Sequence, residues 1–239
     1  IRDRSPSRGL VDVYKRQPWY QGEPLLTILE NLSSVDEVSH SNADFYFPVQ
    51  LVVRQDADKA DDFRGYQGRI ERGSVQLGQT IRIEPNGLTA KVTEIITPKG
   101  EVTQAVAGEV ITLRLDRDID ISRGDLFVDE SSPLTPQKQL EATICWFDER
   151  PLNIARKYLL KHGTQTVFAK ISEIESVLNV HTLEQESGAT DLKMNDIARV
   201  RLSLQKPIVA TTYEENIAGG AFILVDEATY NTVAAGMIL

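Results

Sequence analysis

Few side chains in this sequence are spaced for chemistry. Asp62-Phe63-Arg64-Gly65 matches Asp-x-x-Gly, a pattern that positions the catalytic water in nucleotide hydrolases. It fixes only two of four positions and follows an acidic loop. The chain contains no Gly-x-x-x-x-Gly-Lys-Ser/Thr phosphate loop and no Asn-Lys-x-Asp guanine-reading sequence. We therefore interpret the match as a coincidence and predict no GTP-binding residue in this chain.

Other candidate groups are equally poor in catalytic potential. Gly219-Gly220 precedes an apolar run and is typical of a turn that leads into a strand, because no helix is expected after it to complete a phosphate site. The carboxylate pairs Asp61-Asp62 and Asp148-Glu149 are adjacent in sequence, which places them on opposite faces of a strand or in solvated loops. Three histidines and Cys145 are too scattered for a metal cluster. We predict no catalytic residue, metal site or cofactor in this chain.

From Phe45 onward the sequence predicts short strands. Apolar and polar residues alternate along 88–93, 111–116 and 199–204, which places one set inward and the other in water. Pro85-Asn86-Gly87 is a strong hairpin signal, and Pro98-Lys99-Gly100 is a weaker one. Many short strands at this spacing favour an all-β sandwich or closed barrel.

The pattern divides the chain into four regions. Residues 1–17 carry five basic and two acidic residues, lack an apolar segment and resemble translated cloning sequence, so we expect a non-native tail. Residues 18–44 contain the only strong helix candidate, with Gly22 and Pro24 at its start, followed by a polar linker. The pattern breaks again between Asp129 and Pro136, which predicts β domains at 45–130 and 137–239.

The composition limits the possible partners and compartments. The chain has 239 residues, 41% of them hydrophobic, and a net charge of -9, which argues against general affinity for nucleic acid. Its single cysteine excludes an internal disulfide and is typical of the cytoplasm. Its longest apolar runs are too short to cross a bilayer, so no membrane partner is expected.

Glycines mark the predicted turns. Gly73 and Gly78 each follow a short strand and would supply the positive φ that tight turns demand. Gly68 lies inside a predicted strand and indicates a bulge or a close approach of two backbones. Gly108 and Gly124 take similar turn positions near the end of the first β domain.

This glycine pattern within Phe63–Ile83, together with Ala107–Val110 and Ile121–Asp125, resembles the second domain of translation-factor GTPases, a small barrel. Several further segments resemble one branch of that superfamily, sulfate adenylyltransferase subunit 1: Pro18–Leu26, Phe47–Gln50, Phe63–Tyr66, Asp120–Asp125, Trp146 with Pro151-Leu152, Tyr158–Lys161 and Gly236–Ile238. The resemblance covers nearly all of 18–239. It implies two consecutive β-barrels, of the domain 2 and domain 3 types, preceded by one short helix from the end of a truncated GTPase domain.

The resemblance also implies a function. The family's GTP-hydrolysing subunit acts with a small catalytic subunit, which forms adenosine 5′-phosphosulfate from ATP and sulfate, and it uses GTP and magnesium in a domain expected before Pro18. This chain is then expected to be inactive alone and to serve in subunit contact and coupling, with the small subunit and its own missing GTPase domain as partners.

We single out Arg64 and Tyr66 as a possible partner contact, because aromatic and arginine residues are enriched at interfaces. Equally compatible with the sequence is a Tyr66 packed inside the barrel and a solvated Arg64. Two other functions stay open: the tRNA-binding barrels of an elongation factor, and an independent enzyme with a site between the barrels, for which the sequence offers no residue set.

Overall fold

The computed structural model describes residues 22–31, 44–55 and 63–239. It divides into two units, 1–39 and 40–239. The predicted tail at 1–17 and nearly all of the predicted linker lie outside the described residues.

The first unit contributes one short helix, α2 (Leu25–Asn31). It begins directly after Pro24, whose carbonyl accepts a hydrogen bond from the Ile28 N–H at 3.0 Å. None of its residues is buried, and the apolar side chains of Leu25, Leu26 and Leu29 are all exposed. Within the described residues 22–31, α2 therefore presents apolar surface that no other element covers.

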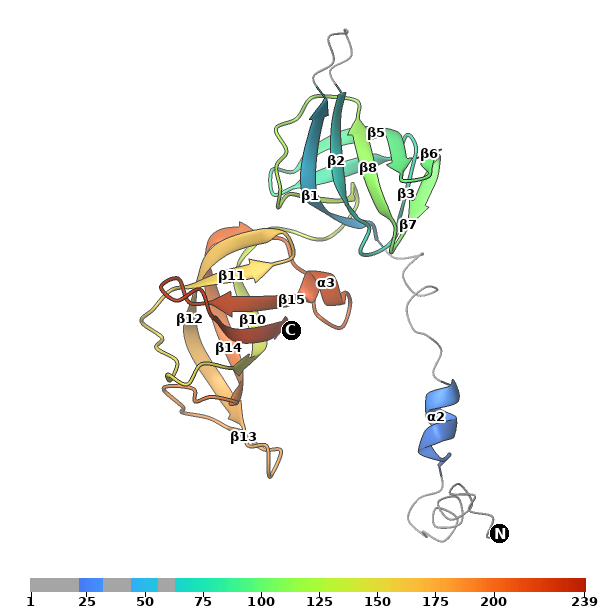
Figure 1. Ribbon diagram of the computed structural model, residues 1–239. Coiled ribbons are helices and arrows are strands. Elements are labelled where there is room, and N and C mark those ends of the chain that lie inside the picture. The colour runs from blue at the N-terminus through green and yellow to red at the C-terminus, as the bar shows by residue number, and fades with distance from the viewer. Residues whose placement is uncertain (1–21, 32–43, 56–62) are drawn as a thin grey trace, which may run out of the picture. The chain divides into compact units, whose positions relative to one another are not determined.

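The second unit starts with a closed antiparallel barrel (Figure 1, blue to green). Its ring runs β4-β9-β1-β2-β8-β5 and closes through the β4–β5 pairing, while β6 pairs with β5 outside the ring and β3 pairs with β7. The strands are β1 (Tyr46–Gln55), β2 (Phe63–Arg69), β3 (Ser74–Gln76), β4 (Thr80–Glu84), β5 (Leu88–Thr97), β6 (Gly100–Val102), β7 (Gln104–Val106), β8 (Val110–Leu115) and β9 (Leu126–Asp129).

Aromatic rings fill much of the interior of this first barrel. Phe47 is stacked between Phe45 and Phe127, with ring centroids 6.0 and 5.6 Å away. Tyr66 meets the Phe127 ring edge-on at 5.5 Å. These arrangements are the ones that aromatic quadrupoles favour, and they fix the orientation of the β2 residues around Tyr66.

The glycines singled out in the sequence lie where side chains are difficult to accommodate. Gly73, Gly78, Gly108 and Gly124 have φ values of 74°, 83°, 92° and 103°. Gly68 lies opposite a register shift in β1, and a Cβ at this position would come within 2.5 Å of the Pro48 carbonyl oxygen. Gly68 thus permits β1 and β2 to approach closely at a bulge.

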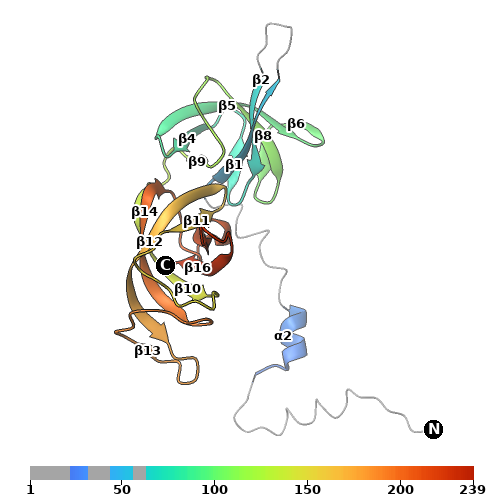
Figure 2. The same cartoon turned by 60° about the vertical axis from the view of Figure 1, so that its left-hand side comes forward.

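A second closed antiparallel barrel follows (Figure 1, yellow to red). Its ring runs β11-β15-β16-β10-β14-β12 and closes through β11–β12, with β13 as an added strand. β12 has two register shifts against β14 and bends around the barrel (Figure 2). The elements are β10 (Gln137–Trp146), β11 (Tyr158–His162), β12 (Gln165–Leu178), β13 (Gln185–Glu186), β14 (Ile197–Ile208), α3 (Ile217–Gly220), β15 (Ala221–Val225) and β16 (Thr232–Ile238).

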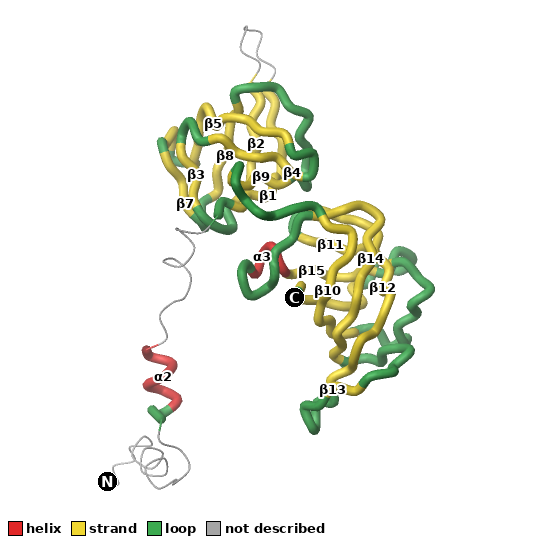
Figure 3. The backbone as a smooth tube through the Cα atoms, turned by 180° about the vertical axis from the view of Figure 1, so that it is seen from behind, coloured by secondary structure: helices red, strands yellow, loops and turns green. Residues whose placement is uncertain are grey.

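The four-residue helix α3 was not predicted from the sequence. It ends in Gly219-Gly220 and leads directly into β15 (Figure 3). A Cβ at Gly220 would come within 2.3 Å of the Tyr213 backbone, so the pair permits tight packing rather than phosphate binding. The expectation that Gly219-Gly220 leads into a strand is confirmed, but the pair forms the end of a helix where a turn was expected.

The connection between the barrels is held by one arginine. Arg82 Nε lies 2.7 Å from the buried Glu84 carboxylate. The same guanidinium donates to the carbonyl oxygens of Glu130, Ser132 and Leu134 at 2.9, 2.9 and 2.8 Å. Because each carbonyl is fixed by the same rigid fork, the linker follows one path along the first barrel.

The prediction of an all-β chain with two consecutive barrels after one short helix is confirmed. Among the described residues, no helix is long and apolar enough to span a membrane.

Candidate functional site

The structure places Arg64 and Tyr66 on the same strand, with their side chains in contact. The Arg64 guanidinium carbon lies 5.7 Å from the centre of the Tyr66 ring. Tyr66 is 1% exposed and donates its hydroxyl hydrogen to the Ile119 carbonyl at 3.3 Å. Tyr66 therefore belongs to the barrel interior, and Arg64 covers it on the outside.

Arg64 is itself mostly buried, whereas its acidic partners are not. Its side chain is 15% exposed and forms a close ion pair with Asp118, which is 82% exposed. Asp120, fully exposed, lies 4.0 Å from the guanidinium. Within the described part of the chain, the buried Nε of Arg64 has no hydrogen-bond partner.

These residues line a polar cavity of about 300 Å³, which we call the Arg64 pocket. Four arginines and two aspartates contribute to its wall: Arg54, Arg64, Arg114, Arg117, Asp116 and Asp118, with Tyr66 and Leu115. Arg114 is paired with Glu94 at 2.8 Å and lies 5.8 Å from the Phe63 ring centre. Asp116 accepts a hydrogen bond from the Lys91 N–H at 2.9 Å, and its carboxylate is 3.6 Å from Arg117.

The pocket offers fixed charges and hydrogen-bond donors rather than groups that transfer protons. Burial raises the pKa of Tyr66, and the nearby Arg64 charge only partly offsets this. The phenol thus remains protonated at neutral pH and acts as a donor. Arginines keep their charge throughout the physiological range. Fixed positive charges and N–H donors can bind an anion, but they supply no general base.

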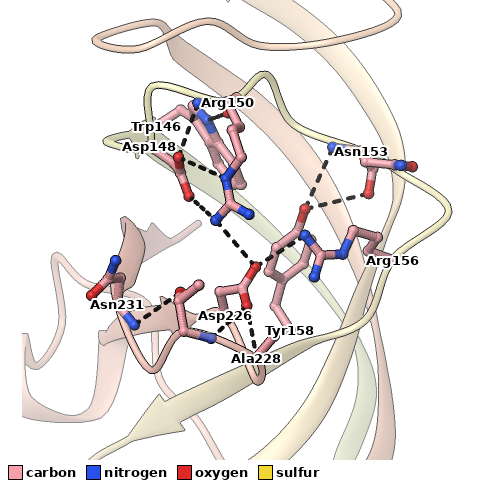
Figure 4. A network of polar contacts seen from close by, with 10 residues as sticks. Trp146, Asp148, Arg150, Asn153, Arg156, Tyr158, Asp226, Ala228 and Asn231 are labelled. Carbon is pink, nitrogen blue, oxygen red and sulfur yellow. Dashed lines mark hydrogen bonds and ion pairs between the residues drawn. The ribbon is translucent and has the colours of Figure 1, made fainter.

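A second polar cluster lies at one end of the other barrel, centred on Asp226 (Figure 4). This carboxylate is 2% exposed and accepts hydrogen bonds from the backbone N–H groups of Ala228 and Thr229 at 2.8 and 3.1 Å. It also faces Arg156 at 3.0 Å and Arg150 at 3.6 Å. We call these groups the Asp226 network. They join the β10–β11 loop to the turn between β15 and β16.

The electrostatics of Asp226 favour the charged form. Burial alone would raise its pKa, but the two backbone donors and both guanidinium groups outweigh burial and hold the pKa below its usual value. Arg150 is in turn held by Asp148 at 2.8 Å, and its carbonyl accepts the Trp146 indole N–H at 2.9 Å. The network is therefore satisfied from within.

Sequence reasoning did not identify Asp226, and it placed Asp148 and Glu149 either on opposite faces of a strand or in a solvated loop. The available signal was local: an aspartate followed two and three residues later by Ala228 and Thr229 at the end of an apolar strand is typical of an Asx turn. No local sequence pattern indicates that Arg150 and Arg156 pair with Asp226, because both come from a distant loop.

Of the other histidine and carboxylate candidates, His40, Asp61 and Asp62 lie outside the described residues, and His162 lines a separate cavity of about 330 Å³. His162 is buried and donates to the Gly219 carbonyl at 2.8 Å, and burial lowers its pKa. Across residues 22–31, 44–55 and 63–239, His, Cys, Asp and Glu side chains form no group of three that could hold a metal ion.

Comparison with known proteins places this geometry in context. Residues 139–239 match the family model described as GTP-eEF1A C-terminal domain-like. The chain is 40% identical to the bifunctional enzyme NodQ of Rhizobium tropici over 96% of its own length and 35% of that protein. It is 38% identical to sulfate adenylyltransferase subunit 1 of Teredinibacter turnerae, covering 97% of this chain and 48% of that protein.

The fold has solved counterparts as well. The crystal structure of sup35 complexed with GMPPNP matches 93% of this chain and 53% of its own with a TM-score of 0.76, at 21% identity. This likeness concerns the fold alone. The chain spans less than half the length of the curated relatives it matches, at 35% and 48%. Along 97% of its length the chain is thus similar to sulfate adenylyltransferase subunit 1, and its second barrel lies in the segment that matches the GTP-eEF1A C-terminal domain-like model.

Proposed function

We propose that this chain supplies the two barrels of the GTP-hydrolysing subunit of a sulfate adenylyltransferase. That enzyme forms adenosine 5′-phosphosulfate from ATP and sulfate together with a small catalytic subunit. The observation that carries the proposal is similarity to sulfate adenylyltransferase subunit 1 along 97% of the chain. GTP and magnesium would act in the whole protein, in the cytoplasm, and not in the segment described above.

The barrels serve in subunit contact and in coupling. Their polar clusters hold fixed charges, and the cavity beside Arg64 and Tyr66 suits recognition of another molecule. In this proposal α2 is the last helix of the GTPase domain, which would cover its exposed leucines, and the barrels occupy 45–130 and 137–239. Arg64 is the contact residue, and Tyr66 supports it from inside the barrel.

Co-expression with a small subunit of a related sulfate adenylyltransferase tests the proposal. We expect a tagged form of this chain to retain the small subunit through a pull-down, and Arg64→Ala to reduce retention. Calorimetry with GTP and magnesium should give no binding to the chain alone, because it lacks a phosphate loop. Saturable micromolar GTP binding, or no retention of the small subunit by the unaltered chain, contradicts the proposal.

The second candidate is a tRNA-binding pair of barrels from a translation factor. The eEF1A-like match at 139–239 favours it. A filter-binding assay with aminoacyl-tRNA separates the two: binding that weakens steeply with salt supports the translation factor. We expect none, because the net charge of the chain is -9.

A further inference from the structure

We propose that the Arg64 pocket is an oxyanion-binding site, which takes a carboxylate of a protein partner or a free tetrahedral anion such as sulfate. The ligand chemistry follows from the pocket wall alone. The inference rests on the proposed function only where a protein partner is the source of the carboxylate.

The first support is the distribution of charge. The chain carries a net charge of -9, yet four arginines and only two aspartates line this one cavity. Arginine presents a planar fork of N–H donors that matches the geometry of carboxylate, phosphate and sulfate oxygens. A cavity of about 300 Å³ has room for a group of this size.

The second support is that Arg64 is already held in place. It lies on the Tyr66 ring, which is fixed in the barrel by its edge-on contact with Phe127. A side chain that is ordered before binding loses little further conformational entropy when a ligand arrives. The buried Nε of Arg64 has no partner in the part of the chain that the structure describes, so the present partners do not fully satisfy this guanidinium.

The third support is the nature of the groups that now pair with Arg64. Asp118 and Asp120 are exposed side chains on the segment that follows β8. An exposed carboxylate that pairs with a guanidinium contributes little stability and exchanges readily with solvent. Asp118 therefore occupies the position of a ligand oxyanion, and a stronger or better oriented acceptor displaces it.

Titration calorimetry of the chain with sodium sulfate, at constant ionic strength with chloride as balance, measures the site. We expect saturable binding with a dissociation constant on the order of millimolar. Asp118→Asn should tighten it about two- to five-fold, because the internal competitor loses its charge. The double variant Arg54→Gln/Arg117→Gln should weaken it at least about five-fold, since it removes two charges from the wall.

The control is Arg201→Gln, in the other barrel, where Arg201 pairs with Glu141, Glu173 and Glu175. It should leave sulfate binding unchanged. A short polyglutamate peptide is the second probe: tighter binding than sulfate identifies a protein carboxylate as the source, and equal or weaker binding identifies a small anion.

Absence of saturable binding of either probe to the unaltered chain and to Asp118→Asn overturns the inference. So does binding that Arg54→Gln/Arg117→Gln leaves intact, or that Arg201→Gln reduces equally. These results are independent of the pull-down. A chain that retains the small subunit but binds no oxyanion refutes this inference and leaves the proposed function standing.

Discussion

The Arg64 pocket and the Asp226 network use the same residue types with opposite burial. In the pocket the arginine is mostly buried, at 15% exposure, and its aspartate partner is 82% exposed. In the network the aspartate is buried, at 2%, whereas Arg150 and Arg156 are 56% and 43% exposed. Asp226 has hydrogen-bond and ion-pair partners for its carboxylate. Arg64 instead keeps an Nε that has no hydrogen-bond partner among the described residues.

This difference indicates that the Asp226 network stabilises the fold, whereas the arginine of the Arg64 pocket can exchange its acidic partners. A buried carboxylate is stable only if donors surround it, and Asp226 obtains them from its own turn and from a distant loop. An arginine can remain charged at an edge with water-exposed acids as temporary partners. We therefore expect substitutions in the network to change folding stability, and substitutions in the pocket to change binding.

The largest effect should come from Asp226→Ala. It leaves the backbone N–H groups of Ala228 and Thr229 without an acceptor and removes the partner of two arginines. We expect the free energy of unfolding to fall by about 2–4 kcal/mol in urea denaturation. Asp226→Asn keeps an oxygen for the turn and should lose about 1–2 kcal/mol. A loss below about 1 kcal/mol for Asp226→Ala would show that the network is not structural.

The next effect is a pH dependence specific to the network. The folded-state pKa of Asp226 is lowered, so its contribution to stability is complete above the unfolded pKa of about 4 and disappears as the pH falls through the folded value. The stability difference between the unaltered chain and Asp226→Asn should therefore shrink below about pH 4.

His162 adds its own pH dependence to the folding stability, and the comparison with Asp226→Asn cancels this contribution. Burial lowers its pKa, so the folded state loses stability as the pH falls below the unfolded value of about 6.5. Subtracting the Asp226→Asn curve cancels this term, because both proteins retain His162. A difference curve that changes between pH 5 and 7 instead contradicts the role of Asp226.

A smaller effect is expected for Arg64→Met, which keeps an apolar stem over Tyr66 but loses the guanidinium. The cation–π contact and two ion pairs should account for about 1 kcal/mol of unfolding free energy. The matched change Arg150→Met should cost less, because Asp226 keeps Arg156 and its backbone donors. Thermal unfolding of both variants checks this order, and its reversal would remove the distinction between the two regions.

The smallest change in stability should follow Asp118→Asn, at less than about 0.5 kcal/mol, because the carboxylate is largely in water. The same substitution should tighten oxyanion binding, so stability and affinity move independently. A loss above about 1 kcal/mol in chemical denaturation would place Asp118 with the structural residues instead.

The barrels could be predicted because their signals are local. Val200, Leu202 and Leu204 alternate with polar residues and are all buried, while Arg199 and Arg201 face outward and pair with glutamates on neighbouring strands. Period-two alternation determines which face of a strand is buried wherever that strand is paired. The positive φ values of Gly73 and Gly78 follow from equally local requirements.

The rest depends on pairings that no local pattern contains. The β10–β11 loop and the β15–β16 turn meet only because the barrel closes, so the grouping of Arg150 and Arg156 around Asp226 could not be inferred. The sequence indicated Arg64 and Tyr66 as neighbours on a strand but left two interpretations open. The structure combines them: Tyr66 packs inside, and Arg64 lies at the edge of a cavity.

The hydrogen bonds from Arg82 to the linker determine where the chain can be cut to separate the two barrels. Three carbonyls between Glu130 and Leu134 depend on this one side chain of the first barrel. A boundary placed after Asp129 would remove these acceptors from the Arg82 guanidinium. The linker backbone would then lose the hydrogen bonds that fix its path. A cut after Pro136 keeps the linker attached to the first barrel, to which Arg82 binds it. The two barrels are therefore best separated at this position for independent study.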